Sequence, residues 1–122
     1  MSNIIGIGTD IIEIERVLKC CKKDSFLKNY YTEAEQELIK KKKNRAATNF
    51  AGKEAVVKAF GTGFLNCMPG DIEIFRDEQG RPYVNLLDKA KKIADKKGIK
   101  KIHISLSDTD TLATAYAVAE GE

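Results

Sequence analysis

The sequence predicts an α+β protein in which a small mixed or antiparallel sheet packs against helices. The chain has 122 residues, 43% of them hydrophobic and 32% charged, which suits one domain with a modest core rather than a disordered chain. Some segments alternate with period two and others have helical spacing. They follow one another without a regular strand–helix rhythm, which favours α+β over a doubly wound parallel sheet.

The N-terminal half is predicted to contain one strand and three helices. Residues 4–10 alternate isoleucine with glycine, as a strand does, and residues 11–21 space their apolar side chains as a helix does. Thr32 and Glu35 have the spacing of a capping box, which opens the second helix. The third helix is expected over residues 46–60, where a Gly-Thr-Gly segment ends it.

The C-terminal half is predicted to contain a hairpin, a helix and two further strands. An Asp-Glu-Gln-Gly turn joins the hairpin strands, and Gly98 closes the helix. The predicted elements are strands 72–76 and 82–85, helix 86–97, and strands 102–107 and 112–119. No repeat or linker interrupts the chain, so we expect a single domain over residues 1–122.

The start of the chain and its cysteines indicate a cytoplasmic protein. The N-terminus lacks the basic stretch and apolar run of a signal peptide, and no apolar run approaches the roughly 20 residues of a membrane span. Cys20 and Cys21 are adjacent and Cys67 stands alone, without zinc-ligand spacing. We therefore expect reduced thiols and no membrane partner.

Two dense basic runs lie at residues 40–45 and 96–101, in a chain of net charge +3. Such runs attract nucleic acid, phosphorylated ligands or acidic proteins. Alternatively, each basic run simply forms the solvent-exposed face of a helix and binds no partner.

The first strand carries a candidate carboxylate. Gly6, Gly8 and Asp10 lie on one face of it, and two glycines leave room for a ligand or another backbone beside Asp10. Alternatively, Asp10 caps the next helix.

The third helix carries a carboxylate and an ammonium on what its spacing predicts to be an apolar side. A partly desolvated Glu54 there must be paired, protonated or metal-bound. An exposed Glu54–Lys58 pair is the alternative. The side is formed by Ala47, Phe50, Ala51, Glu54, Val57 and Lys58.

Three further features stand beyond this helix. The glycines of residues 61–63 can present backbone N–H groups to a phosphate, or simply end the helix. The strand over 102–107 places His103, Ser105 and Ser107 on one face. No nucleophilic triad motif is present.

The last strand has two distinct faces. We expect Leu112, Thr114, Tyr116 and Val118 to fill the core of the chain, and the alanines at 113, 115, 117 and 119 to meet another subunit. The alternative is that a helix of the same chain, such as residues 86–97, covers the alanine face.

Together, three motifs resemble the small bacterial holo-acyl-carrier-protein synthase family of the phosphopantetheinyl transferases. They are IIGIGTDIIEIERV (4–17), FAGKEAVVKAFGTG (50–63) and IHISLSDT (102–109), and the match runs nearly end to end. The resemblance implies the phosphopantetheinyl transferase fold and a cytoplasmic, Mg²⁺-dependent homotrimer with active sites between subunits. Its members transfer 4'-phosphopantetheine from coenzyme A to a serine of apo-acyl carrier protein, releasing adenosine 3',5'-bisphosphate, in fatty acid biosynthesis.

The resemblance also assigns roles to individual residues. Asp10 and Glu54 correspond to the ligands of Mg²⁺, and Lys58 to the lysine that contacts the phosphates. Arg16 corresponds to a basic residue that meets the acidic acyl carrier protein. The remaining coenzyme A contacts implied are Gly61, Thr62, Gly63, Arg81, Pro82 and Ser105.

Two positions depart from the family pattern. Asn49 stands where many members carry arginine, which leaves Lys53 or the 41–45 run to supply a phosphate contact. Asp108 stands where many carry histidine. The general base is therefore open between Asp108, Glu54 and a metal-bound water.

Two other classes of function compete with the transferase. An RNA- or phosphate-binding module would interleave aromatic residues with the basic ones, but residues 40–45 hold none and the chain has no tryptophan. A non-catalytic subunit of a larger assembly would not need Asp10 and Glu54. Coenzyme A with Mg²⁺, but not RNA, should raise the melting temperature of the transferase.

Overall fold

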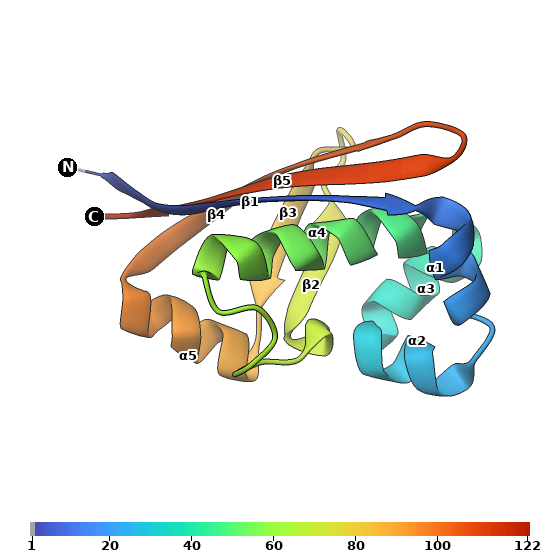
Figure 1. Ribbon diagram of the computed structural model, residues 1–122, viewed down its shortest axis with the longest axis horizontal. Coiled ribbons are helices and arrows are strands. Elements are labelled where there is room, and N and C mark those ends of the chain that lie inside the picture. Colours follow the sequence, from blue (N-terminus) through green and yellow to red (C-terminus); the bar gives the residue numbers. More distant parts are fainter. Residues whose placement is uncertain (1) are drawn as a thin grey trace.

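A computed structural model describes residues 2–122 and has the expected α+β architecture (Figure 1). A three-stranded sheet of order β1-β5-β4 and a β2-β3 hairpin are both antiparallel. None of the described helices is long and apolar enough to cross a membrane. The elements are β1 (Asn3–Glu13), α1 (Ile14–Cys20), α2 (Asp24–Tyr30), α3 (Glu33–Lys41), α4 (Arg45–Phe60), a 3₁₀ turn (Pro69–Asp71), β2 (Ile72–Arg76), β3 (Pro82–Leu86), α5 (Asp88–Lys97), β4 (Ile99–Asp108) and β5 (Leu112–Gly121).

The first strand runs three residues further than the sequence predicts. Residues 11–13 were expected to begin a helix, but Ile11 and Ile12 pair with Thr114 and Ala113 in the sheet. The helix α1 therefore starts only at Ile14. Pairing with β5, which is distant in the sequence, outweighs the helical spacing of the apolar residues. The isoleucines in this segment are β-branched and favour a strand over a helix.

Helix α4 packs along the inner face of the three-stranded sheet (Figure 1). A Cβ atom at Gly6 would collide with the carbonyl oxygen of Ala59, and one at Gly8 with that of Ala55. The two glycines of β1 thus admit the backbone of a helix of the same chain. The resulting contact makes α4 the centre of the core, where most of its residues are buried.

The two faces of β5 are opposite to the prediction. The alanines at 113, 115, 117 and 119 are buried beneath α4, not against a second subunit or α5. The face with Leu112 and Tyr116 points outward, and Tyr116 remains 64% exposed. Small side chains mark the side that a helix approaches closely, and period-two alternation alone cannot say which face is inward.

The helices that precede α4 pack around its N-terminal half. The Thr32–Glu35 capping box at the start of α3 is present as expected. Helix α2, which the sequence pattern did not indicate, supplies Phe26 and Tyr30, whose rings stack 4.4 Å apart. The Tyr31 hydroxyl donates to the Ala46 carbonyl at 2.7 Å and ties this group to α4.

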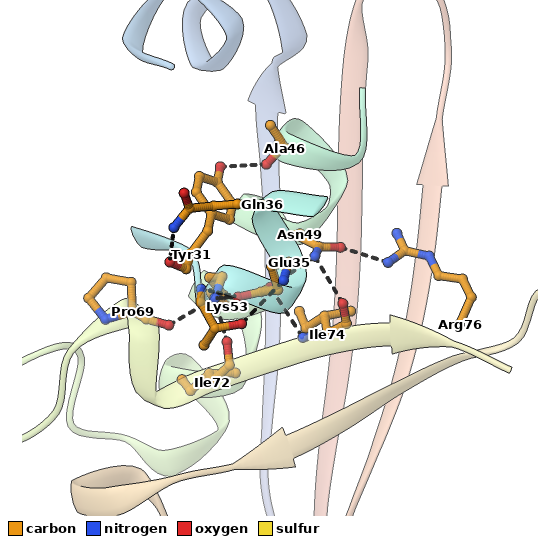
Figure 2. A network of polar contacts seen from close by, with 11 residues as sticks. Tyr31, Glu35, Gln36, Ala46, Asn49, Lys53, Pro69, Ile72, Ile74 and Arg76 are labelled. Atoms are coloured by element: carbon orange, nitrogen blue, oxygen red, sulfur yellow. Dashed lines mark hydrogen bonds and ion pairs between the residues drawn. The ribbon is translucent and has the colours of Figure 1, made fainter. Parts of the chain in front are cut away.

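A buried polar network connects α3, α4 and β2 (Figure 2). The Lys53 ammonium donates to Glu35 Oε1 at 2.6 Å, to the Pro69 carbonyl at 2.9 Å and to the Ile72 carbonyl. Burial lowers the pKa of Lys53, while the charge of Glu35 opposes that shift. Because every donor is used, the ion pair can persist in the core.

Candidate active site

The end of β1 and the most open side of α4 together form a small acidic site. Phe50, Glu54 and Lys58 lie one turn apart and are the least buried residues in the middle of α4. Ala47, Ala51 and Val57 of the predicted apolar side are buried in the core, but the rest of that side is the stripe of α4 that reaches solvent, because the helix is otherwise covered almost all round. A half-buried Glu54 is nevertheless as expected.

Lys58 and Asp10 meet at this site. The Lys58 ammonium donates to the Thr9 carbonyl at 2.8 Å and lies 3.5 Å from Asp10 Oδ1. The side chain of Lys58 is 53% exposed, whereas that of Asp10 is 15% exposed. Asp10 Oδ2 is buried and has no hydrogen-bond partner among residues 2–122. A buried acceptor without a donor is costly, so this oxygen is prepared for an external cation or donor.

The positive charge of Lys58 does not fully compensate the two carboxylates of the site. Burial raises the pKa of Asp10, and Lys58 only partly opposes it. Burial also raises the pKa of Glu54, and the nearby charge of Asp10 raises it further. Two partly desolvated carboxylates therefore share a single nearby ammonium, and a further cation would favour their charged forms.

The two carboxylates suit Mg²⁺ in chemistry and number. No cluster of three or more His, Cys, Asp and Glu side chains that could enclose a metal occurs within residues 2–122. Mg²⁺ usually keeps several waters and takes one or two carboxylates together with the phosphates of a substrate. Asp10, through its orphaned oxygen, and Glu54 fit that role.

The glycine segment after α4 has the expected helix-ending geometry. Gly61 adopts a left-handed conformation with φ of 80° and its N–H donates to the Val57 and Lys58 carbonyls. Gly63 also has positive φ, and the Thr62 hydroxyl donates to its carbonyl at 3.0 Å. The segment thus begins one turn beyond Lys58, next to the acidic site.

Other predicted site residues lie at the opposite edge of the sheet. Asp10 and Leu106 both pair with Ala115, from opposite sides. Two strand spacings put β1 and β4 about 10 Å apart, with α4 packed beneath β5, the one strand between them. Asp108 and Pro82 line a hollow on the β4 side, away from Asp10.

Arg81 and Ser105 are also away from the acidic site. Arg81 is exposed in the hairpin turn, where its N–H donates to Asp77 Oδ1 at 2.9 Å. Ser105 lies on the outer face of the sheet with His103, as the alternation predicted. One chain therefore brings together Asp10, Glu54 and Lys58 but not the residues expected near the nucleotide.

Arg16 lies on the exposed side of α1 and borders an apolar groove of about 550 Å³. The rings of Phe26, Tyr30 and Phe50 line this groove and stack on one another. The sequence indicated Arg16 only through family resemblance. The aromatic groove was missed, because its rings come from two helices far apart in the sequence.

Lys53 cannot supply the phosphate contact that the sequence left open. Its side chain is fully buried and bonded to Glu35, so it cannot reach a ligand. Sequence reasoning also missed Arg76, whose guanidinium donates to Asn49 Oδ1 at 2.7 Å. The only available signal was the unusual asparagine at position 49.

Comparison with known proteins finds relatives that match nearly the whole chain. The family model of the 4'-phosphopantetheinyl transferase superfamily matches residues 6–119. A holo-acyl-carrier-protein synthase of Lachnoclostridium phytofermentans is 50% identical over 117 residues, which cover 96% of each chain.

Solved structures with the same fold include ligand complexes. The acyl carrier protein synthase of Plasmodium yoelii with ADP bound has a TM-score of 0.90 and 35% identity, and covers 100% of this chain and 98% of its own. The holo-acyl-carrier-protein synthase of Helicobacter pylori in complex with coenzyme A has a TM-score of 0.83 and 33% identity, and covers 93% and 98%.

Proposed function

This chain belongs to the 4'-phosphopantetheinyl transferase superfamily, and we propose that it works as a Mg²⁺-dependent homotrimer in the cytoplasm. It transfers the 4'-phosphopantetheine group of coenzyme A to a serine of apo-acyl carrier protein, the reaction of a holo-acyl-carrier-protein synthase in fatty acid biosynthesis. Adenosine 3',5'-bisphosphate is the other product. The three free cysteines are consistent with a reducing compartment.

The observation that carries the proposal is the buried Oδ2 of Asp10, which has no hydrogen-bond partner among residues 2–122, in a carboxylate that lies close to Lys58 and Glu54. Asp10 and Glu54 would hold Mg²⁺, which supplies a Lewis acid for the pyrophosphate oxygens. Lys58 is exposed beside Asp10 and can stabilise negative charge on the leaving nucleotide. The glycine segment after α4 leaves space for the phosphates beside Lys58.

The attacking hydroxyl belongs to the carrier-protein serine, so the chain needs only a base and a positioned leaving group. Glu54 has a raised pKa and lies at the acidic site, but a carboxylate that holds Mg²⁺ is a poor base. Asp108 lies at the other edge of the same chain and reaches the site only from a neighbouring subunit. We propose that Asp108 of that neighbour serves as the base.

The proposed trimer uses the outer face of the β1-β5-β4 sheet. Ile7, Ile11 and Tyr116 on this face are 70%, 61% and 64% exposed, and such apolar stripes mark interaction surfaces. If chains join across this face, the β1 edge of one chain, which carries Asp10, would lie near the β4 edge of its neighbour, where Pro82 and Asp108 lie. This arrangement replaces the rejected interface through the alanine face of β5.

Oligomeric state tests the trimer. The variant Tyr116→Arg should be a folded monomer with little transfer activity, while wild type scatters light as a trimer. A wild-type monomer that stays fully active at nanomolar concentration would overturn the shared-site arrangement.

Acyl carrier protein presents an acidic surface, and we propose that Arg16, at the rim of the aromatic groove, contacts it. The variant Arg16→Glu should raise the KM for the carrier protein without changing that for coenzyme A. An unchanged KM would place recognition elsewhere.

Mass spectrometry of the carrier protein tests the function itself. Apo-acyl carrier protein incubated with this chain, coenzyme A and Mg²⁺ should gain the mass of phosphopantetheine on one serine. No mass gain with a folded chain and a competent carrier protein would refute the transferase assignment.

A further inference from the structure

The aromatic groove opens directly onto the acidic site. Ile12 lines the groove and lies on the same face of β1 as Asp10, two residues before it. Phe50 lines the groove from α4, one helical turn before Glu54. Each carboxylate of the acidic site therefore has a groove-lining residue as its neighbour on the same element. A partner protein that docks in the groove would lie next to phosphates bound at the acidic site.

Tyr30, the last residue of α2, lies where the groove meets the acidic site. Its ring stacks on that of Phe26, with centroids 4.4 Å apart, and on that of Phe50, with centroids 5.3 Å apart. The Tyr30 and Phe50 planes differ by only 16°. Because Phe50 and Glu54 share the stripe of α4 that reaches solvent, this stacking places the phenol of Tyr30 over the side of α4 that carries Glu54.

The hydroxyl of Tyr30 is a hydrogen-bond donor that the chain itself does not use. The neighbouring Tyr31 is buried and its hydroxyl donates to the Ala46 carbonyl at 2.7 Å, whereas within residues 2–122 the hydroxyl of Tyr30 forms no hydrogen bond. Burial raises the pKa of Tyr30, and the nearby charge of Glu54 raises it further. The phenol therefore keeps its proton at neutral pH and offers a neutral donor beside Glu54.

The reaction brings one group to this junction. The carrier-protein serine enters from the groove, and the pyrophosphate of coenzyme A belongs with Asp10, Glu54 and Lys58. The serine oxygen forms a bond to phosphorus and its proton passes to the base. The bond from phosphorus to the bridging oxygen breaks, and its electron pair leaves with adenosine 3',5'-bisphosphate. During this exchange negative charge spreads over the non-bridging oxygens of the transferred phosphoryl group.

A phosphoryl oxygen is a better partner for a phenol than the serine is. The serine needs a free lone pair for its attack, and a donor bonded to its oxygen would withdraw those electrons. A non-bridging phosphoryl oxygen has lone pairs to spare and gains charge as the reaction proceeds. A neutral O–H group stabilises that charge without repelling a cation held by the two carboxylates.

We propose that Tyr30 is a catalytic residue whose phenol hydroxyl donates a hydrogen bond to a non-bridging oxygen of the transferred phosphoryl group. The inference rests on the proposed function, since it names a residue that acts on the reacting group of that same substrate. It also explains why an aromatic residue with a free hydroxyl stands at the inner end of a groove that is otherwise lined mainly by apolar side chains.

Ligand binding without a carrier protein tests the contact. Coenzyme A contains the phosphate that is transferred, whereas adenosine 3',5'-bisphosphate lacks it. By calorimetry in the presence of Mg²⁺, Tyr30→Phe should weaken coenzyme A about 5-fold and leave adenosine 3',5'-bisphosphate within about twofold. The variant keeps the ring and its stacking on Phe26 and Phe50. Equal weakening of both ligands, or unchanged binding of coenzyme A, would overturn the proposal.

A spectroscopic signal of the phenol gives a second readout. The chain has four tyrosines, so labelling their ζ carbons with carbon-13 gives a simple NMR spectrum. The resonance of Tyr30 is the one that Tyr30→Phe removes. Coenzyme A with Mg²⁺ should shift this resonance, and adenosine 3',5'-bisphosphate should shift it much less. A Tyr30 resonance that stays in place with saturating coenzyme A would contradict the contact.

Kinetics separate catalysis from recognition of the carrier protein. Tyr30→Phe should lower kcat about 10- to 100-fold, while the KM for acyl carrier protein stays within about twofold. A raised KM with an unchanged kcat would assign the hydroxyl to carrier-protein recognition and overturn the catalytic role.

Tyr31→Phe is the matched control, because it removes the hydroxyl of the adjacent tyrosine. That hydroxyl is bonded inside the chain, so its loss should lower the melting temperature and leave both kcat and the affinity for coenzyme A unchanged. A fall in kcat as large as that of Tyr30→Phe would trace the effect to disturbed packing of α2 and refute the inference.

This inference and the proposed function fail in different ways. If the carrier protein gains no mass but coenzyme A binding still depends on the Tyr30 hydroxyl, the contact stands and the transferase assignment fails. If transfer occurs and Tyr30→Phe keeps the wild-type kcat and affinity for coenzyme A, only this inference fails.

Discussion

Two lysine–carboxylate pairs lie on opposite sides of the same helix and differ in almost every respect. Lys53 and Glu35 are 2.6 Å apart and fully buried. The ammonium of Lys53 donates three hydrogen bonds, so none of its N–H groups lacks a partner. Lys58 and Asp10 are 3.5 Å apart, partly open to solvent, and leave one carboxylate oxygen unsatisfied. The closed pair holds α3, α4 and β2 together, whereas the open pair leaves one buried acceptor without a donor among the described residues.

Distance alone does not separate a structural pair from a functional one. Lys91 and Asp95 on α5 are also 2.6 Å apart, but their side chains are 59% and 60% exposed. The pairs differ in how deeply their side chains are buried and in whether each carboxylate oxygen accepts a hydrogen bond. Substitutions in the three pairs should therefore have effects of very different size and kind.

The closed pair should give the largest loss of stability. Lys53→Met leaves the Glu35 carboxylate buried without its counter-charge, and the free energy of unfolding should fall by about 3–5 kcal/mol. Urea denaturation measures this loss. Adding Glu35→Gln should recover part of it, and a Lys53→Met protein as stable as wild type would contradict the structural role.

The open pair should instead show its effect in activity. Lys58→Ala should lower kcat/KM for transfer about 10²-fold, as loss of a fixed charge at a reacting phosphate does, while stability changes by less than about 1 kcal/mol. Transfer kinetics and denaturation on the same preparation separate the two. A stability loss as large as that of Lys53→Met would erase the distinction between the pairs.

The exposed pair sets the lower limit of the comparison. Lys91→Ala should cost no more than about 0.5 kcal/mol of stability, the usual contribution of an (i, i+4) pair on a helix surface. Transfer activity should be unchanged, because Lys91 is on α5, away from the acidic site. A loss above about 1 kcal/mol would show that short distance by itself stabilises this protein.

The features predicted correctly from the sequence are mostly those determined by residues adjacent in the chain. The capping box at Thr32 and Glu35, the hairpin and the glycine that ends α4 all formed as expected. Each depends on local backbone chemistry that a few adjacent residues determine. Asp10, Glu54 and Lys58 were also identified correctly as neighbours, through the spacing on α4 and the family motifs.

The errors came from partners far along the chain. Residues 11–13 joined a strand because β5 continues beside them, and the alanine face of β5 turned inward because α4 lies there. The Glu35–Lys53 pair joins residues 18 positions apart on two helices, and Asn49 reaches Arg76 across 27. Sequence periodicity carries no information about such contacts, so Lys53 stood as one alternative for a phosphate contact and Arg76 was missed.

The Mg²⁺ dependence of transfer tests most directly the proposal that Asp10 and Glu54 form a metal site. Initial rates should rise with Mg²⁺ and saturate for wild type, and a chelator should abolish them. For Asp10→Asn the rate should stay at least about 10²-fold lower at every Mg²⁺ concentration, although its unfolding matches that of wild type. Undiminished wild-type transfer in the chelator, or a wild-type rate from Asp10→Asn at saturating Mg²⁺, would contradict the account.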